Sequence, residues 1–250
     1  MNKYVCDRCG KPIKSYELLC PECDKWLGDW ANKNKYRYII MCGGQYKDWE
    51  QARQLTEIGG EPIVARTIRL LRENEIENKN ISISSNLDGF ENFGVKVLKH
   101  DNPYKTADFN GGEGYWVDGF YPTKEPVCYI FGDVVFSEDA IKTIVETETD
   151  SIEFFASAPP FDPRFTKRWA EPFAFKVKNN IRFGLCIDNV RMFERMGFFK
   201  RRAIAWELWQ VIKGTPLNLI DYTNYTVIND WTCDIDSPED IARMERFVNG

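Results

Sequence analysis

Residues 36–71 constrain the fold more than any other stretch of this 250-residue chain. The stretch opens with the apolar run 38–42, which has the length and character of a buried strand. Gly43 and Gly44 follow at once, and a polar loop then carries Lys47 and Arg53. A strand followed by a glycine loop with basic residues is how an α/β protein presents backbone N–H groups and cations to a phosphate.

The same stretch continues into a turn at Gly59 and Gly60, after which Pro62 opens a helix with an apolar face. Two glycines directly after a strand, such as Gly43 and Gly44, often form nothing more than a tight turn. A phosphate loop and a simple turn therefore both stay open at this point.

The rest of the chain alternates between strand and helix patterns, which predicts an α/β fold. Apolar or alternating runs predict strands at 81–85, 94–99, 127–131, 151–158 and 173–177 (the last with the alternation of an exposed face), and one more that leads from Tyr225 to Asp234. Helices are predicted after Ser137, over 189–213 and after Ser237. The run 127–131 is the most apolar, so we expect it at the centre of the sheet.

Four of the eight cysteines are spaced as a metal site. Cys6, Cys9, Cys20 and Cys23 form a C-x2-C-x10-C-x2-C pattern. Four thiolates suit tetrahedral Zn²⁺ in a closed, structural site, and a rubredoxin-like iron site is the alternative. The spacing resembles a zinc ribbon. Residues 1–30 are thus expected to form a zinc ribbon, 31–35 a polar linker and 36–250 the α/β domain.

Composition excludes several classes of function. The net charge of -5 and pI near 5.2 argue against a dedicated nucleic-acid surface, which needs a basic face. There is no apolar run of roughly 18 residues and no signal-peptide core at the N-terminus, so a cytoplasmic protein without a membrane partner is expected. His100 is the only histidine, which excludes His-based triads and multi-His metal sites.

Aspartates end two of the predicted strands. Asp133 follows Gly132 at the end of 127–131, where α/β sheets bind ligands. Ser137 is already a good N-cap for the next helix, which weakens a capping role for Asp133. Asp234 and Asp236 stand just before the helix start at Ser237, whose cap does not account for them.

These elements together resemble the GT-A-like nucleotidyltransferases, the kin of sugar-phosphate, phosphocholine and methylerythritol-phosphate cytidylyltransferases. The resemblance is carried by Gly43 and Gly44, residues 52–55 (Ala-Arg-Gln-Leu), Gly59 and Gly60, residues 61–63 (Glu-Pro-Ile), Gly132 and Asp133, and residues 236–240 (Asp-Ser-Pro-Glu-Asp). Two elements depart from the family pattern. The usual Pro-Lys is Ala52 and Arg53, and the usual Gly-x-Arg is replaced by residues 45–47 (Gln-Tyr-Lys).

The resemblance implies a three-layer, mostly parallel sheet of GT-A or Rossmann-like type and a Mg²⁺-dependent transfer of NMP to a small phosphorylated acceptor, with release of pyrophosphate. CTP and UTP are the favoured donors. The residues implied to bind the nucleotide are Met41, Cys42, Gly43, Gly44, Gln45, Arg53, Gly132 and Asp133. Arg53, Lys47, Asp133 and Asp236 are the implied catalytic residues. Asp133 and Asp236 would hold Mg²⁺, with Asp234 as an alternative or supporting ligand.

Other segments carry weaker implications. The resemblance places residues 101–121 near the nucleotide base. Residues 200–202 (Lys-Arg-Arg) and Arg164 are candidate contacts to the acceptor phosphate, although a charged helix surface also explains such a run. Trp206, Trp209 and nearby tyrosines suit either a core or an aromatic cage for a quaternary amine.

Two other functions stay open. A GT-A glycosyltransferase would use an Asp-x-Asp motif, which residues 234–236 satisfy. A catalytically weak nucleotide-binding or scaffold protein would also fit, with the zinc ribbon docking a protein partner or a second subunit.

Overall fold

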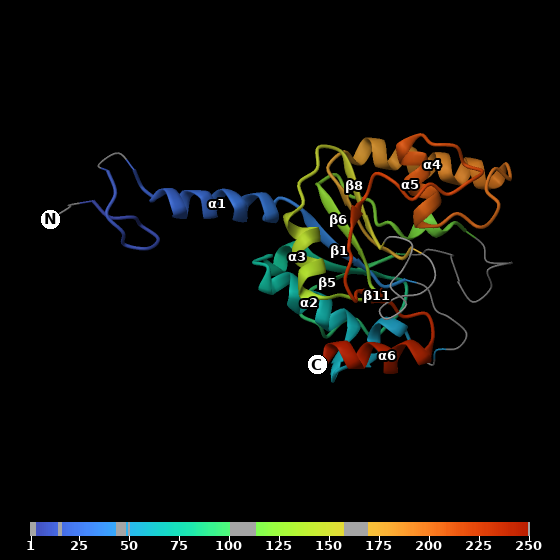
Figure 1. The fold of residues 1–250 in the computed structure, drawn as a ribbon, viewed down its shortest axis with the longest axis horizontal. Coiled ribbons are helices and arrows are strands. Elements are labelled where there is room, and N and C mark those ends of the chain that lie inside the picture. The colour runs from blue at the N-terminus through green and yellow to red at the C-terminus, as the bar shows by residue number, and fades with distance from the viewer. Residues whose placement is uncertain are drawn as a thin grey trace.

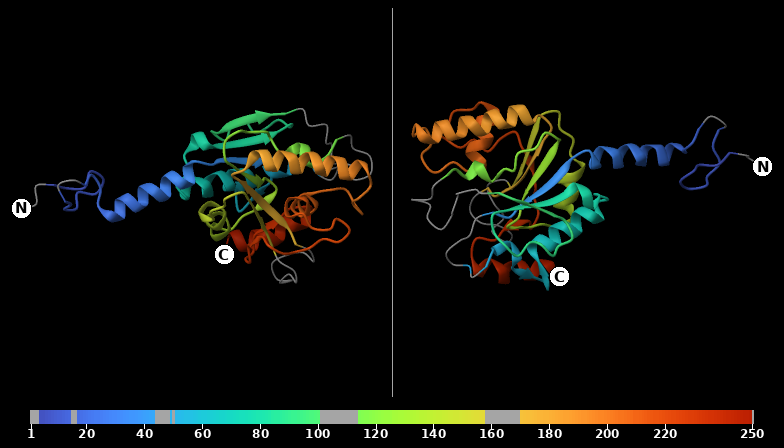
Figure 2. Two further views of the ribbon diagram at one scale, coloured as in Figure 1. Left: turned by 90° about the horizontal axis from the view of Figure 1, so that it is seen from above. Right: turned by 180° about the vertical axis from the view of Figure 1, so that it is seen from behind.

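A computed structural model describes residues 4–14, 17–43, 49, 51–100, 114–157 and 170–249. Within them, the chain forms an α/β body from which helix α1 (Pro21–Asn34) extends, with the cysteine module at its far end (Figures 1 and 2). The predicted linker, residues 31–35, is helical through Asn34. The side chain of Asn34 donates to the carbonyl of Glu75 and accepts from the N–H of Glu77. The end of α1 is therefore fixed to the body.

A seven-stranded sheet forms the centre of the body, in the order β10-β8-β9-β6-β1-β4-β5. The pairs β6–β1, β1–β4, β4–β5 and β10–β8 are parallel, while β9 is antiparallel to both of its neighbours. The strands are β1 (Arg37–Met41), β4 (Ile81–Ser85), β5 (Lys96–Lys99), β6 (Val127–Phe131), β8 (Ile152–Ala156), β9 (Pro172–Val177) and β10 (Thr226–Val227). The mostly parallel sheet is confirmed.

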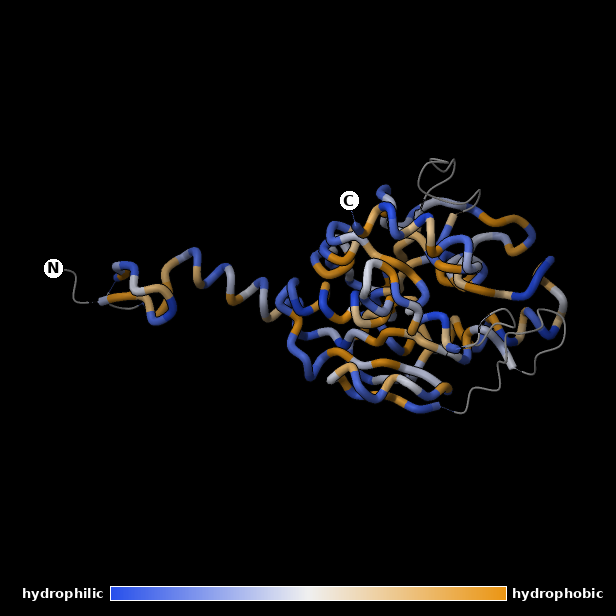
Figure 3. The backbone as a smooth tube through the Cα atoms, turned by 90° about the horizontal axis from the view of Figure 1, so that it is seen from below, coloured by the Kyte–Doolittle hydropathy of each residue, from blue (hydrophilic) through white to orange (hydrophobic). Residues whose placement is uncertain are grey.

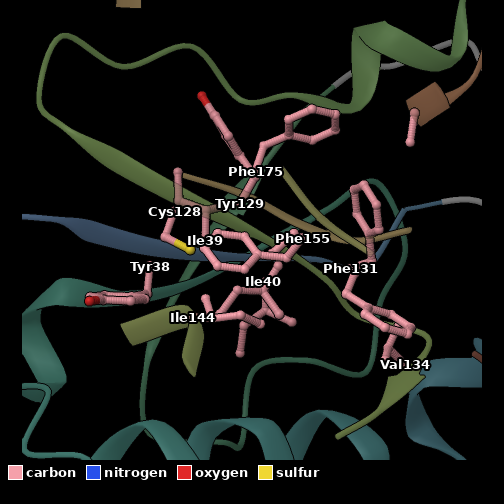
Figure 4. Packing of buried hydrophobic residues seen from close by; sticks show 14 of the residues in the cluster. Tyr38, Ile39, Ile40, Cys128, Tyr129, Phe131, Val134, Ile144, Phe155 and Phe175 are labelled. Carbon is pink, nitrogen blue, oxygen red and sulfur yellow. The ribbon is translucent and has the colours of Figure 1, made fainter. Parts of the chain in front are cut away.

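Helices cover both faces of the sheet, which makes the three layers that were expected (Figure 1). One face carries α2 (Ile63–Glu73) and α3 (Glu138–Glu146), and the other carries α4 (Asn180–Arg195) and α5 (Ala205–Lys213). In Figure 4, Tyr129 and Phe175 point away from Ile40 and Ile144. Phe183 of α4 packs on Tyr129 and Phe175, whereas Ile144 belongs to α3. The two groups of side chains therefore lie on opposite faces of the sheet. Figure 3 shows hydrophobic stretches running through the body between hydrophilic ones.

Three sequence predictions about these elements were wrong. The single strand expected to lead from Tyr225 to Asp234 is two short strands, β10 in the main sheet and β11 (Cys233–Asp234) in a separate ladder. The helix expected over 189–213 is two helices, because α4 ends before Gly197, whose φ of +71° is a left-handed conformation. The strand at 173–177 was expected to have an exposed face, but β9 is buried on both faces because helices cover both sides of the sheet: Phe175 packs on Phe183 of α4, and Lys176 reaches the end of α3.

Two small ladders lie beside the main sheet. A hairpin joins β2 (Glu57–Ile58) to β3 (Glu61–Pro62) through Gly59 and Gly60, both at positive φ, as a type I′ turn requires. A Cβ on Gly59 would lie 2.5 Å from Val248 Cγ1 of α6 (Pro238–Val248), so glycine also permits close packing there. The second ladder pairs β7 (Val134–Val135) with β11 (Cys233–Asp234). In the described segments the chain also forms three 3₁₀ turns: η1 (Arg53–Leu55), η2 (Asn78–Asn80) and η3 (Trp116–Gly119).

No helix in the described part of the chain is long and apolar enough to cross a membrane.

One buried lysine joins the sheet to a helix end. Lys176 of β9 is 1% exposed, and its ammonium donates to the carbonyls of Ile144, Val145 and Thr147 at 3.1, 2.9 and 2.7 Å. These carbonyls lie at the C-terminal end of α3, where backbone acceptors lack helical partners and the helix dipole is negative. Burial lowers the pKa of Lys176, and the three carbonyls satisfy its donors.

We predict that Lys176→Met destabilises the protein by about 2–4 kcal/mol, because it leaves buried carbonyls without a donor. Urea unfolding followed by circular dichroism measures this. The matched control is Lys178→Met, two residues on, where the side chain is exposed and forms a surface ion pair with Asp150. The control is expected to change stability by less than about 0.5 kcal/mol. Equal effects of the two substitutions would contradict the capping role.

Candidate active site and metal centre

The predicted site begins at the carboxyl end of β6, where Gly132 precedes Asp133. The N–H of Gly132 donates to the carbonyl of Met41 at 3.0 Å. A Cβ on Gly132 would lie 2.6 Å from both that carbonyl oxygen and Cys42 Sγ, a distance that side chains do not tolerate. Glycine is therefore needed for the ends of β6 and β1 to approach each other.

The residues at the end of β1 are largely engaged by the sheet. The N–H of Cys42 donates to the carbonyl of Ser84, and the carbonyl of Cys42 accepts from Ser85 Oγ at 2.8 Å. Burial raises the pKa of the Cys42 thiol well above its usual range, and the charge of Asp133 adds to the rise. Cys42 is thus a neutral, packed side chain. Gly43 comes next, and a Cβ there would meet His100 and Asn86 at ordinary contact distances.

Two of the predicted nucleotide-binding residues, Gly44 and Gln45, and the predicted catalytic residue Lys47 lie outside the described residues, as do Arg164 and residues 101–113.

Arg53 is the residue that joins the two predicted metal ligands. Its guanidinium is nearly buried, at 6% exposure, and forms an ion pair with Asp133 through Nη2. Nη1 donates to Asp236 Oδ1 at 3.2 Å and to the carbonyl of Ile235 at 3.0 Å. A buried guanidinium is stable only when charges and acceptors surround it, and these three groups supply them. The structure therefore brings Arg53, Asp133 and Asp236 together, as the sequence predicted them to act together.

The β7–β11 ladder explains how Asp236 reaches Asp133. The N–H of Ile235 donates to the carbonyl of Asp133 at 2.9 Å, which extends the ladder by one bond. The chain then turns into α6, where Asp240 Oδ2 accepts from the N–H groups of Asp236 and Ser237, each at 3.0 Å. The predicted helix start at Ser237 is confirmed.

A second group of carboxylates lies around Asp236. The ligand atoms of Glu171, Asp234 and Asp236 lie within 4.8 Å of one another. Glu171 is buried at 5% exposure, while Asp236 is exposed. Carboxylate oxygens are the donors that Mg²⁺ and Mn²⁺ prefer, so this set fits a hard divalent cation. In the described residues, Asp133 is not part of this group.

Sequence reasoning missed Glu171, which stands just before β9. It is positioned by the β8–β9 pair: its N–H donates to Ser157 Oγ, and its carbonyl accepts from the N–H of Ser157. No local motif marks it, because its neighbours in space come from a different part of the chain. Only the antiparallel placement of β9 brings it to this edge.

The segments predicted to bind the acceptor have structural partners. Arg201 pairs with Glu207 at 2.6 Å, and Arg202 donates to the carbonyl of Gly114. Trp206 and Trp209 are buried, and their indole N–H groups donate to the carbonyls of Ala170 and Thr223. These two tryptophans belong to the core.

The four cysteines at the tip of α1 meet as predicted. Their sulfurs lie within 4.8 Å of one another, and Cys9 Sγ and Cys20 Sγ are 3.7 Å apart. A tetrahedral ion with metal–sulfur distances of about 2.3 Å has sulfur–sulfur edges of about 3.8 Å. The second Cys pair opens α1, since Cys20 is its N-cap. Ile13 and Leu19 are the hydrophobic residues that pack with these cysteines, so the donor set is the centre of the module.

Comparisons with known proteins identify the fold. No family model and no curated protein matches the chain. The solved structure of 2-C-methyl-D-erythritol 4-phosphate cytidylyltransferase from Thermus thermophilus matches with a TM-score of 0.52 at 11% identity, over 86% of this chain and 100% of that chain. A structure from Bacillus anthracis, named for glucose-1-phosphate thymidylyltransferase, matches with a TM-score of 0.51 at 14% identity, over 85% of this chain and 94% of that chain. Such likeness confirms the fold that the resemblance implied.

We predict that the purified chain carries one zinc ion, because four thiolates at tetrahedral spacing form the centre of a module with almost no other core. Elemental analysis measures the zinc content per chain. Iron in place of zinc, in a rubredoxin-like centre that colours the protein, would contradict the prediction. Cys9→Ser is expected to lose the metal and Cys186→Ser to keep it.

After chelation, four more thiols should react with Ellman's reagent. Cys128, whose pKa burial raises to about 12, should react only in denaturant.

Proposed function

We propose that the chain is a nucleotidyltransferase that transfers NMP from an NTP to a sugar phosphate or phospho-alcohol and releases pyrophosphate. One observation carries the proposal: a buried Arg53 links Asp133, at the carboxyl end of β6, to Asp236, just before α6. The carboxyl edge of a parallel sheet is where α/β folds bind ligands. The fold likeness to a cytidylyltransferase supports the same placement.

The reaction asks for charge balance and alignment more than for covalent chemistry. An oxygen of the acceptor phosphate forms a bond to the α-phosphorus of the NTP. The bond from that phosphorus to the bridging oxygen breaks, and its electron pair leaves with pyrophosphate. The attacking phosphate is already ionised at neutral pH, so no general base is needed. The single histidine of the chain is consistent with this scheme.

The described residues suggest separate roles. Arg53 holds the two aspartates in place and supplies positive charge where the phosphates bind. Asp236, with Asp234 and Glu171, would hold Mg²⁺, and Asp133 stays the fourth candidate ligand. The bound ion would neutralise phosphate charge and polarise the P–O bond that breaks. Gly43 and Gly44 would give backbone donors, Lys47 would receive the pyrophosphate, and Met41, Cys42, Gln45 and Gly132 would form the floor of the nucleotide site.

The donor and acceptor are proposed by class. The two solved structures described above are named for enzymes of pyrimidine nucleotides, which supports CTP, UTP or dTTP over purine nucleotides. Their names also point to a small phosphorylated acceptor. Cysteines arranged for a metal, with no disulfide among the described residues, support a cytoplasmic location.

Two other functions keep some support. Asp234 and Asp236 lie in one carboxylate group, as the Asp-x-Asp motif of a GT-A glycosyltransferase would require, and such an enzyme would hydrolyse a UDP-sugar. The replacement of Pro-Lys by Ala52 and Arg53 supports a catalytically weak binding protein, which would bind NTP without turnover.

We predict pyrophosphate release with Mg²⁺ and one pyrimidine NTP, tested against sugar 1-phosphates, phosphocholine and related phospho-alcohols. Asp133→Ala and Asp236→Ala are expected to lower kcat/KM by about 10²–10³-fold, because each leaves the Arg53 charge unbalanced and removes a carboxylate from the site. Asp150→Ala, at a surface ion pair remote in sequence from the site, should act like the wild type. Activity that survives both site substitutions would overturn the proposal.

The role of Glu171 is tested by metal binding without turnover. Glu171→Gln is expected to weaken Mn²⁺ binding about tenfold, measured by electron paramagnetic resonance in the presence of nucleotide, because one charged ligand is lost. Glu148→Gln, at an exposed position paired with Lys35, is the control and should leave the affinity unchanged. Equal affinity in the wild type and Glu171→Gln would remove Glu171 from the metal site.

A further inference from the structure

One row of side chains crosses four strands of the main sheet near their carboxyl ends. The register places Phe131 of β6 beside Met41 of β1. It places Ser84 of β4 between Met41 and Leu98 of β5. Residues in register on adjacent strands share a face of the sheet, and for Phe131 this is the face of Tyr129, on which α4 packs. Met41 and Leu98 are only half-buried, so this part of the face is partly accessible.

The next row on the same face holds polar side chains. Continuing the register by two residues places Gly43 beside Asn86 and Asn86 beside His100. The side-chain positions agree with this, because a Cβ on Gly43 would lie 3.6 Å from Asn86 Oδ1 and 3.7 Å from Cε1 and Nε2 of His100. Gly43 is exposed and has no side chain. The Asn86 carboxamide and the edge of the His100 ring therefore border an accessible stretch of backbone.

The carboxamide of Asn86 is held in place, but its oxygen is not satisfied. Ser85 Oγ donates to the carbonyl of Cys42 at 2.8 Å and accepts from the N–H of Leu87 at 2.9 Å, which fixes the backbone on both sides of Asn86. Asn86 Oδ1 is buried and has no hydrogen-bond partner among the described residues, and the same holds for Ser84 Oγ, two residues earlier on the same face. Buried polar atoms are almost always paired in folded proteins, so this acceptor points to a ligand that brings a donor.

The distance of Asn86 from Asp133 selects the part of a nucleotide that it would meet. The strand order β6-β1-β4 puts two strand spacings between the end of β6, where Arg53 pairs with Asp133, and the end of β4. Two spacings are about 10 Å. A ribose and its base span a distance of this order. A nucleotide bound with its phosphates beside Arg53 and its ribose over Gly43 would therefore have its base at Asn86.

We propose that Asn86 recognises the hydrogen-bonding edge of the pyrimidine base of the donor nucleotide, an inference that rests on the nucleotidyltransferase function proposed above. The side chain offers one acceptor, Oδ1, and two N–H donors on Nδ2. Cytosine presents its N4 amino group as a donor beside N3 as an acceptor, and uracil and thymine present N3–H beside O4. Each edge pairs with one of the two orientations of the carboxamide, and Oδ1 then receives the donor that it lacks. Met41 and Leu98 supply apolar surface next to the base.

Nucleotide binding in the absence of acceptor tests the proposal, with tripolyphosphate as a ligand that has the phosphates but no base. Isothermal titration calorimetry of the full chain with Mg²⁺ measures the dissociation constants of CTP, UTP, dTTP and tripolyphosphate. Asn86→Leu keeps the size of the side chain and removes its polar atoms. It should raise the dissociation constant of the pyrimidine nucleotide that the wild type binds by about 10–100-fold, because two hydrogen bonds to the base are lost, and leave that of tripolyphosphate unchanged. Asn92→Leu, at an exposed asparagine of the same connection between β4 and β5, is the control and should change neither constant.

The two kinds of ligand separate this inference from the function on which it rests. A wild-type chain that binds neither the nucleotides nor tripolyphosphate would overturn both. Nucleotide affinity that is equal in the wild type and Asn86→Leu would overturn the role of Asn86 alone. A parallel loss of nucleotide and tripolyphosphate binding would give Asn86 a structural role and overturn the proposal as well. So would an effect of Asn86→Leu that is smaller for the 2′-deoxynucleotide than for the ribonucleotide, because Asn86 would then bind the ribose.

Discussion

The arrangement of the site depends on the need to neutralise one nearly buried guanidinium. Arg53 comes from a 3₁₀ turn early in the chain, Asp133 from the end of the central strand, and Asp236 from the segment before the last helix. Removing either aspartate would leave a buried charge without its partner, which costs far more than the pair itself contributes. The three segments are therefore fixed to one another, and the edge of the sheet acquires a defined set of charges.

A second, smaller core holds this arrangement from outside the main sheet. Ile58 lies on β2 and Ile63 directly follows β3, Val135 lies on the second ladder and Ile235 next to it, and Met244 comes from α6. Gly59 allows α6 to pack directly on the hairpin. The polar contacts among Arg53, Asp133 and Asp236 thus lie beside apolar packing that joins the same segments. This combination holds side chains from distant positions of the chain in one arrangement, as the proposed nucleotidyl transfer would require.

The α/β body and the cysteine module are stabilised by different interactions. The body has a large hydrophobic core, in which even Lys176 is buried by giving each of its donors a carbonyl. The cysteine module has almost no core, and a metal would supply most of its stability. Helix α1 connects the two: its C-terminal end is fixed to the body through Asn34, and the module lies at its other end (Figure 2).

The sequence by itself determined the elements whose signals are local. Apolar runs predicted β1, β4 and β6, the Ser137 and Ser237 caps predicted helix starts, and the cysteine spacing predicted a four-sulfur group. Arg53, Asp133 and Asp236 could be selected because each stands in a short recognisable motif.

Tertiary structure alone decided the rest. Helices cover both faces of β9, and its antiparallel position carries Glu171 to the carboxylate group; no neighbour in sequence signals either fact. Gly197, in a left-handed conformation, ends the first helix and so divides the helical region into α4 and α5. A local motif predicts the structure that a segment adopts by itself. Burial and charge contacts depend on segments that meet only after the chain has folded, so a local motif does not predict them.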